Sequence, residues 1–240
     1  MSKFDEHFES RTGANSPLQQ SSFVFFPEEE LLRRAVAASP ETIREEAFLK
    51  LDRHRGNLER EERFVRKIAR RSATTAEALA DDAEQFAQTL PQSLFGAGGG
   101  DAFMLPLGLF FEQIQERSRT LSECLLDLDV FWTTAPVDFH YFLFLADLLS
   151  DEKLKDETRD LSVRFASNRT RAQELSKRLG NFRETVIERF FERAGKIADL
   201  EHQGAGMRFG ALAGLCGELR YAAQNFAVQC REKPKRTNES

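Results

Sequence analysis

Cysteine is scarce in this sequence, and its three cysteines are far apart. Cys124, Cys216 and Cys230 form no Cys-x-x-Cys pair, which excludes a zinc site built from clustered thiolates. They also lack the dense, even-numbered pattern of a disulfide-stapled secreted domain. The first ten residues are polar and acidic, whereas a signal peptide would carry an apolar segment there. We therefore expect a reducing, cytoplasmic location.

Long apolar runs are also missing. The longest one, residues 137–149, contains Asp138, His140 and Asp147. A helix that crosses a bilayer needs about 20 mostly apolar residues. The sequence therefore predicts no transmembrane span.

Residue patterns that carry catalysis or bind cofactors are absent as well. None of the four histidines belongs to a His-Glu-x-x-His motif, and no Glu-x-x-His pair of the ferritin type occurs. The glycine run at residues 96–100 is not followed by the Lys-Ser/Thr of a phosphate-binding loop, and no strand precedes it. We expect no cofactor, no metal and no small-molecule substrate, and predict a non-enzymatic protein.

Tyrosine and tryptophan are rare, with 2 and 1 copies, whereas phenylalanine occurs 22 times. Phenylalanine fills space between helices and needs no hydrogen-bond partner. This composition predicts a thick, dry interior, and it argues against a surface that stacks sugars or bases.

Helical periodicity covers most of the chain, and no segment has the alternation of a β-strand. The predicted helices span residues 40–71, 75–90, 106–132, 136–149, 150–200 and 205–231. The fourth is apolar nearly all round, which is typical of a helix at the centre of a bundle. The sequence therefore predicts an all-α fold: an elongated helical bundle with long paired, coiled-coil-like helices and a short central buried helix.

Two of these helices carry apolar residues at alternating steps of three and four, the repeat of a coiled-coil seam. In the first helix the repeat consists of Ala47, Leu51, Leu58, Val65 and Ile68, with His54 and Glu61 in the same register. In the fifth it consists of Leu161, Phe165, Asn168, Ala172, Leu175, Leu179, Phe182 and Val186. The unbroken register favours one continuous, bent helix through Gly180 over a stop and a new start.

Two features predict self-association, as a homodimer or within a complex. A single Asn168 in an apolar seam is a device that fixes the register of paired helices. Gly206, Gly210 and Gly214 recur every four residues in the last helix, although each glycine costs about 1 kcal/mol relative to alanine. We interpret them as a tight packing face, in the bundle or in a dimer.

The chain divides into a mobile tail at 1–26, one helical domain at 27–231 and a basic tail at 232–240. A glycine-rich loop is predicted at 92–105. The N-terminal tail ends in an apolar cluster, Phe23, Phe25 and Phe26, next to Pro27. This cluster is interpreted either as a strap on the body of the protein or as a docking segment for another protein.

Basic residues gather in two stretches, although the net charge of the chain is −5. Residues 53–71 contain eight basic and three acidic residues, and residues 159–183 contain seven and two. On the first stretch, Arg63, Lys67 and Arg70 share a helix face. On the second, Arg164, Arg171 and Arg178 repeat every seven residues beside the seam.

Three interpretations of these six residues stay open. They pair with carboxylates on a neighbouring helix, or they bind an acidic protein, RNA or DNA, or they bind an anionic membrane surface. For the membrane, the architecture resembles the elongated helical dimers of the BAR type. The sequence predicts a scaffold, adaptor or accessory subunit that docks another macromolecule, most simply a protein. The alternatives are a nucleic-acid-binding accessory subunit and peripheral membrane association.

Overall fold

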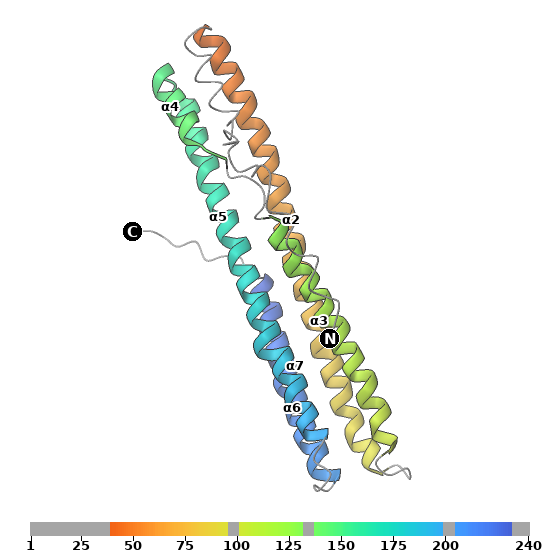
Figure 1. The fold of residues 1–240 in the computed structure, drawn as a ribbon. Helices are drawn as coiled ribbons and strands as arrows, with labels where there is room; N and C mark the ends of the chain where they lie inside the picture. The colour runs from red at the N-terminus through yellow and green to blue at the C-terminus, as the bar shows by residue number, and fades with distance from the viewer. Residues whose placement is uncertain (1–38, 96–100, 132–136, 199–204, 232–240) are drawn as a thin grey trace, which may run out of the picture.

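The computed structural model describes residues 39–95, 101–131, 137–198 and 205–231. Their secondary structure is helical: α2 (Pro40–Phe95), α3 (Asp101–Phe131), α4 (His140–Leu149), α5 (Glu152–Phe182), the π-helical turn η1 (Arg183–Glu188), α6 (Arg189–Ala198) and α7 (Ala205–Arg231). Together they form a long rod (Figure 1), so the predicted all-α helical bundle is confirmed. No helix in the described ranges is long and apolar enough to span a membrane.

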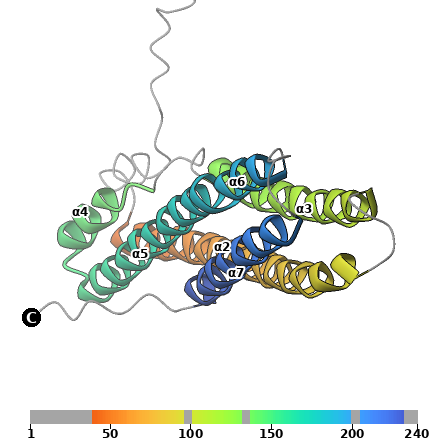
Figure 2. The ribbon, with the colours of Figure 1, turned by 90° about the horizontal axis from the view of Figure 1, so that it is seen from below.

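Ion pairs between helices give the direction in which each helix runs. Those between α2 and α5 rise together in residue number, from Arg44–Asp151 to Glu62–Arg164, so these helices are parallel. Helix α3 runs antiparallel to α2, because Arg71 meets Glu123 whereas Asp82 meets Arg117. Helix α7 is also antiparallel to α2, and Figure 2 shows α2, α3, α5 and α7 side by side.

The interior consists of two apolar cores that follow each other along the rod. The larger core joins α2 from Val65 onward to α3, the C-terminal part of α5, η1, α6 and α7. The smaller core joins α2 up to Leu58 to α4 and the N-terminal part of α5. Both predicted seams point inward. Every seam position from Leu161 to Phe182 of α5 is buried, as are the apolar seam positions of α2: Ala47, Leu51, Leu58, Val65 and Ile68. The remaining seam positions, His54, Glu61 and Val186, are partly buried. Supercoiled pairing of α2 with α5 stays a prediction.

Helix α2 is longer than predicted. The sequence predicted a break between residues 71 and 75, yet one helix of 56 residues passes through this point. Ser72, Ala73 and Ala76 are buried there against other helices. Tertiary packing therefore overrides the weak helix propensity of the Ser-Ala-Thr-Thr segment.

The predicted loop at residues 92–105 was too long. Helix α2 continues through Pro91 to Phe95, and α3 begins at Asp101 and contains Pro106. Both prolines lie within two turns of a helix end. Proline removes one backbone hydrogen bond, and few helical hydrogen bonds lie between that position and the end of the helix. Residues 96–100 lie outside the described ranges.

The short helix is not central, which corrects the prediction for residues 136–149. Helix α4 lies at one end of the rod beside α5 (Figure 1). It buries Phe142, Leu145 and Ala146, whereas Phe144 and Leu148 are 61% and 57% exposed. The apolar pattern correctly indicated a packed helix. The pattern contained no information on how many sides would be covered.

Helix α5 continues through Gly180, as predicted. The π-helical turn η1 follows at Arg183–Glu188, and α6 extends the same rod to Ala198. A π-turn inserts an extra residue into one helical turn. It therefore rotates the residues after it, which lets Ile187, Phe190 and Ala194 stay buried beyond the end of the regular seam.

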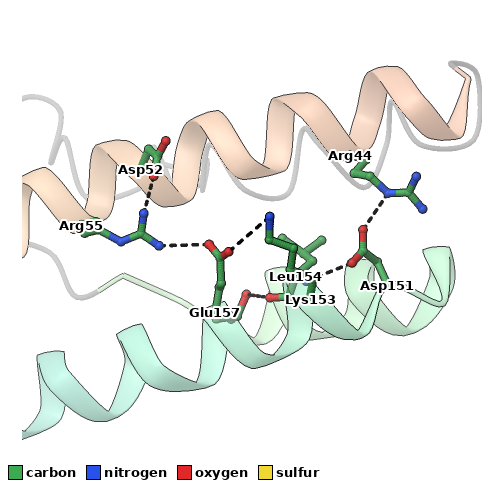
Figure 3. A network of polar contacts seen from close by, with 8 residues as sticks. Arg44, Asp52, Arg55, Asp151, Lys153, Leu154 and Glu157 are labelled. Carbon is green, nitrogen blue, oxygen red and sulfur yellow. Dashed lines mark hydrogen bonds and ion pairs between the residues drawn. The ribbon is translucent and has the colours of Figure 1, made fainter.

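A sharp corner positions α4 and α5. Ser150 adopts a left-handed conformation (φ 52°, ψ 39°), and its N–H bonds to the last carbonyls of α4. Asp151 then caps α5 by accepting a hydrogen bond of 3.0 Å from the backbone N–H of Leu154. Its carboxylate also accepts one of 2.6 Å from Arg44 on α2 (Figure 3), which ties the corner to the start of the long helix.

Candidate functional site: a basic interface on α2 and α5

The outer face of α2 carries a row of cations without acidic partners. Arg63, Lys67 and Arg70 are exposed, and they share a face because they are four and three residues apart. Among the described residues, no carboxylate forms an ion pair with any of the three. Arg60 extends the row toward the N-terminus, where it bonds to the side chain of Asn57 rather than to an acid.

The arginines of α5 lie closer to the interior. Arg164 is half-buried and pairs with Glu62 of α2 at 3.2 Å. Arg178 donates a 2.9 Å hydrogen bond to the carbonyl of Gln229, near the C-terminus of α7, and pairs at 3.6 Å with Glu174 of its own helix. The helix dipole makes this end of α7 a favourable place for a cation.

Arg171 lies between these two residues along α5 and is partly buried. Burial lowers the pKa of its guanidinium, and the nearby positive charge of Arg66 acts in the same direction. Glu62 opposes both effects, but it is already bonded to Arg66 at 3.0 Å and to Arg164. One carboxylate therefore serves three arginines, and positive charge is in excess.

The two basic stretches, separated by about a hundred residues in the sequence, are thus brought together. Arg66 adjoins Arg63 and Arg70 on α2 and lies near Arg171 of α5. We call the combined surface of Arg63, Lys67, Arg70, Arg164, Arg171 and Arg178 the basic interface. Sequence reasoning missed Arg66 and Glu62, which join its two halves. Their four-residue spacing beside the seam was the available signal.

Internal pairing explains part of this surface. Arg164 pairs with a carboxylate on a neighbouring helix, as the first interpretation predicted, whereas Arg178 bonds to a backbone carbonyl of α7 and to Glu174 of its own helix. Arg63, Lys67 and Arg70 have no such contacts within the described part of the chain. The α2 half is therefore the part of the interface whose charges have no acidic partner among the residues that the structure describes.

A polar layer lies beneath this surface, between the two cores. Glu61 lies between Leu58 of the smaller core and Val65 of the larger one. Burial raises the pKa of Glu61, and the charge of Arg169 lowers it by a smaller amount. Asn168 faces the same layer from α5 and is only 6% exposed. Its Nδ2 group has no hydrogen-bond partner among the described atoms.

This position corrects the self-association role predicted for Asn168. A residue buried inside its own chain is not available to a second copy. Its seam pairs with other helices of the same molecule, because the chain is long enough to run along the rod four times, with three reversals of direction.

Replacing Asn168 with leucine should stabilise the protein. The change removes an unpaired buried amide, a group that costs about 1–3 kcal/mol, and it joins the two cores with an apolar contact. We expect the free energy of unfolding in urea to rise by about 1–2 kcal/mol. Thr158→Val is the matched control, because the buried Thr158 hydroxyl already donates a 2.7 Å hydrogen bond to Leu154. A lower free energy of unfolding for Asn168→Leu than for the wild type would contradict this account of the layer.

The glycines of α7 do not pack closely inside the bundle. A Cβ atom added at Gly210, Gly214 or Gly217 would meet no atom within 4 Å, and all three residues are exposed. The prediction of close helix packing within the bundle is therefore wrong at these positions. Gly206 lies in the first turn of α7. The cost of these glycines, about 1 kcal/mol each, has no compensation within the described chain.

The predicted docking segment, Phe23, Phe25 and Phe26, lies outside the described residues, as do the tails at 1–26 and 232–240. The three cysteines are buried, and burial raises the pKa of Cys216 and of Cys230 to about 12. Such thiols stay protonated at neutral pH and are poor nucleophiles. No three metal-ligating side chains gather within the described ranges.

No known protein family, no curated protein and no solved structure matches the chain. The geometry and charge of the basic interface are therefore the main indication of function.

Proposed function

We propose that this protein is a non-enzymatic helical scaffold or adaptor that docks an acidic protein surface on its basic interface. The supporting observation is the row of Arg63, Lys67 and Arg70 on α2. These cations are exposed and have no acidic partner within the described ranges, whereas the arginines around them, such as Arg66 and Arg71, are paired. A rigid helix holds them about 10 Å apart from first to last, at 1.5 Å per residue. An acidic helix or strand is long enough to meet all three.

Nucleic acid is the second candidate, and a different feature favours it. Arginine predominates in the interface, and its planar guanidinium binds phosphate oxygens through two parallel hydrogen bonds. The interface carries no aromatic side chain on which a base could stack. Binding would therefore depend on the phosphate backbone and not on the sequence of bases.

The test is a charge reversal, Arg63→Glu with Lys67→Glu and Arg70→Glu. Three attractions of about 0.5 kcal/mol become repulsions of similar size, so affinity for an acidic partner should fall about 100-fold. The matched control reverses Arg119, Lys153 and Lys196, which are 73%, 77% and 71% exposed and lie away from the interface. Both variants change the net charge equally, so a difference in binding between them depends on where the reversed charges lie.

Three probes separate the partner classes: a fluorescent peptide rich in Glu and Asp, duplex DNA or RNA, and vesicles with anionic lipids. Proteins captured from extract by the wild type and by the control variant, but not by the reversal, identify a protein partner. Nucleic-acid binding that weakens steeply with salt, with a salt dependence reduced by the reversal, favours the second candidate. Equal capture by all three proteins would refute the role of the interface.

A further inference from the structure

Helix α7 has an uncharged face that points away from the bundle. Its residues follow the alternating three- and four-residue steps of a helix-pairing seam. We call this the outer α7 face, and it consists of Met207, Gly210, Gly214, Gly217, Tyr221, Gln224 and Val228. All seven residues are exposed. The opposite side of α7, with Leu212, Leu215 and Leu219, is buried in the larger core, so one helix carries two seams.

Three large side chains make the outer α7 face more than a row of small residues. Met207, Tyr221 and Val228 are 66%, 69% and 56% exposed. Met207 and Val228 lie at the two ends of the face, and three open glycines separate Met207 from Tyr221. Large exposed side chains at seam spacing, with open positions beside them, are typical of a surface that another helix covers.

We propose that a second copy of this chain covers the outer α7 face, with the two α7 helices antiparallel. A two-fold axis between Gly217 and Glu218 places residues equally far from this point opposite each other. Tyr221 of each copy then lies over Gly214 of the other, where no atom occupies the space of a Cβ. Met207 lies opposite Val228. The face is therefore complementary to itself.

The lack of charge on the outer α7 face also favours a second copy of this chain as its partner. The nearest ionisable side chain at the centre of the face is Glu218, which is held by a hydrogen bond of 3.3 Å and a second, shorter one from Arg193 of α6. Gln224 within the face and Asn225 beside it are polar but uncharged. The charge of Glu218 is already balanced by Arg193, so a strongly charged partner gains little here, whereas a second neutral face matches it.

The size of the face indicates a weak dimer. From Met207 to Val228 it extends about 32 Å along the helix. A hollow of about 320 Å³ between α7 and η1–α6 borders the face at Glu218 and Ala222, and it offers further surface to a partner. A contact one helix wide lies at the small end of specific interfaces, so we expect micromolar dissociation.

Analytical ultracentrifugation of the full chain tests the proposal. The wild type should change from monomer to dimer between about 1 and 100 µM. Gly214→Leu fills the space that Tyr221 would occupy, and Tyr221→Lys places two like charges in the contact. Each should weaken dimerisation at least tenfold. Because a Cβ at Gly214 meets nothing in the monomer, Gly214→Leu should unfold at the same temperature or higher.

Gly108→Leu is the matched control, since Gly108 is an exposed helical glycine of α3 that also meets nothing within 4 Å. It should dimerise like the wild type. Cysteine substitutions test the antiparallel orientation of the two α7 helices. Under mild oxidation with copper-phenanthroline, Gly217→Cys should link two copies near the axis, and Gly210→Cys should not.

A wild type that stays monomeric at 500 µM overturns the proposal, and so does a dimer that Gly214→Leu and Tyr221→Lys leave intact. Cross-linking at both cysteine positions overturns the antiparallel arrangement. Reversing the charges of the basic interface should leave dimerisation unchanged, so the two proposals can fail separately.

Discussion

Phe142→Ala is expected to open the α4 end of the molecule while the rest of the bundle stays folded. Phe142 is 1% exposed in the smaller core, and its ring packs edge-on against His54 of α2 at 5.8 Å. Truncating a buried phenylalanine costs about 3–5 kcal/mol. Among the described residues three helices form this core, and α4, which is ten residues long, contributes Phe142, Leu145 and Ala146 to it, so little remains to hold α4 in place.

The larger core should respond differently to the matched change Phe182→Ala. Phe182 is 5% exposed and stacks on Phe226 of α7, with ring centroids 4.3 Å apart. Because α2, α3, α5, α6 and α7 all meet in this core, we expect the loss to lower the free energy of global unfolding by a similar 3–5 kcal/mol.

Hydrogen exchange followed by mass spectrometry distinguishes the two outcomes. In Phe142→Ala, amides of α4 and of the first turns of α2 and α5 should exchange faster, whereas those of α7 should keep their protection. In Phe182→Ala, protection should fall throughout. Uniform loss of protection in both variants would show that the two cores unfold as one unit.

Asp151→Ala should also destabilise the protein, although by less than the loss of either phenylalanine ring. The carboxylate caps α5 at the N–H of Leu154 and also holds Arg44 (Figure 3). Removing a helix cap costs about 1–2 kcal/mol. The Arg44 side chain is 43% exposed, so its ion pair adds only a few tenths of a kcal/mol. We therefore expect a loss of about 2 kcal/mol, measured by urea unfolding.

The effect should depend on pH. The hydrogen bond from the N–H of Leu154 lowers the pKa of Asp151 below its ordinary value of 3.8, and Arg44 contributes in the same direction. The ionised carboxylate thus stabilises the folded state above its unfolded pKa, and this contribution is lost as the pH falls through the folded pKa. Asp151→Asn keeps a capping oxygen without the charge, so its difference from the wild type should vanish in acid.

Asp52→Ala is the control for this corner. Asp52 pairs with Arg55 at 2.5 Å, but its side chain is 66% exposed and caps no helix (Figure 3). Its loss should change the free energy of unfolding by less than about 0.5 kcal/mol. If Asp52→Ala lowered the free energy of unfolding as much as Asp151→Ala, the corner would be stabilised by charge and not by helix capping.

Local pattern was sufficient to predict much of the fold. The bounds of the last helix, residues 205–231, were predicted at both ends, and Gly180 was correctly placed inside a continuous helix. Both results depend on periodic apolar residues, which report which side of a helix is buried. Rules for helix breakers were less reliable. Pro91 and Pro106 lie inside helices. A proline near a helix end is tolerated, because the backbone hydrogen bond that it removes is followed or preceded by few other helical hydrogen bonds.

The candidate site could be predicted only in part. Sequence reasoning found all six arginines and lysines of the basic interface, because charge runs are visible in one dimension. It did not show which of them were already paired. That depends on Glu62, which meets Arg66 through helical spacing but meets Arg164 only through the packing of α5 on α2.

By itself the sequence determined that this chain is helical, which stripe of each long helix is buried, and where positive charge is concentrated. These properties follow from neighbours along the chain, within a turn or two. Only the tertiary structure decided that Asn168 lies inside the molecule, that α4 is at one end, and that the α7 glycines face outward. The physical reason is that periodicity identifies the buried side of a helix, whereas the partner that covers it is set by contacts between residues far apart in the chain.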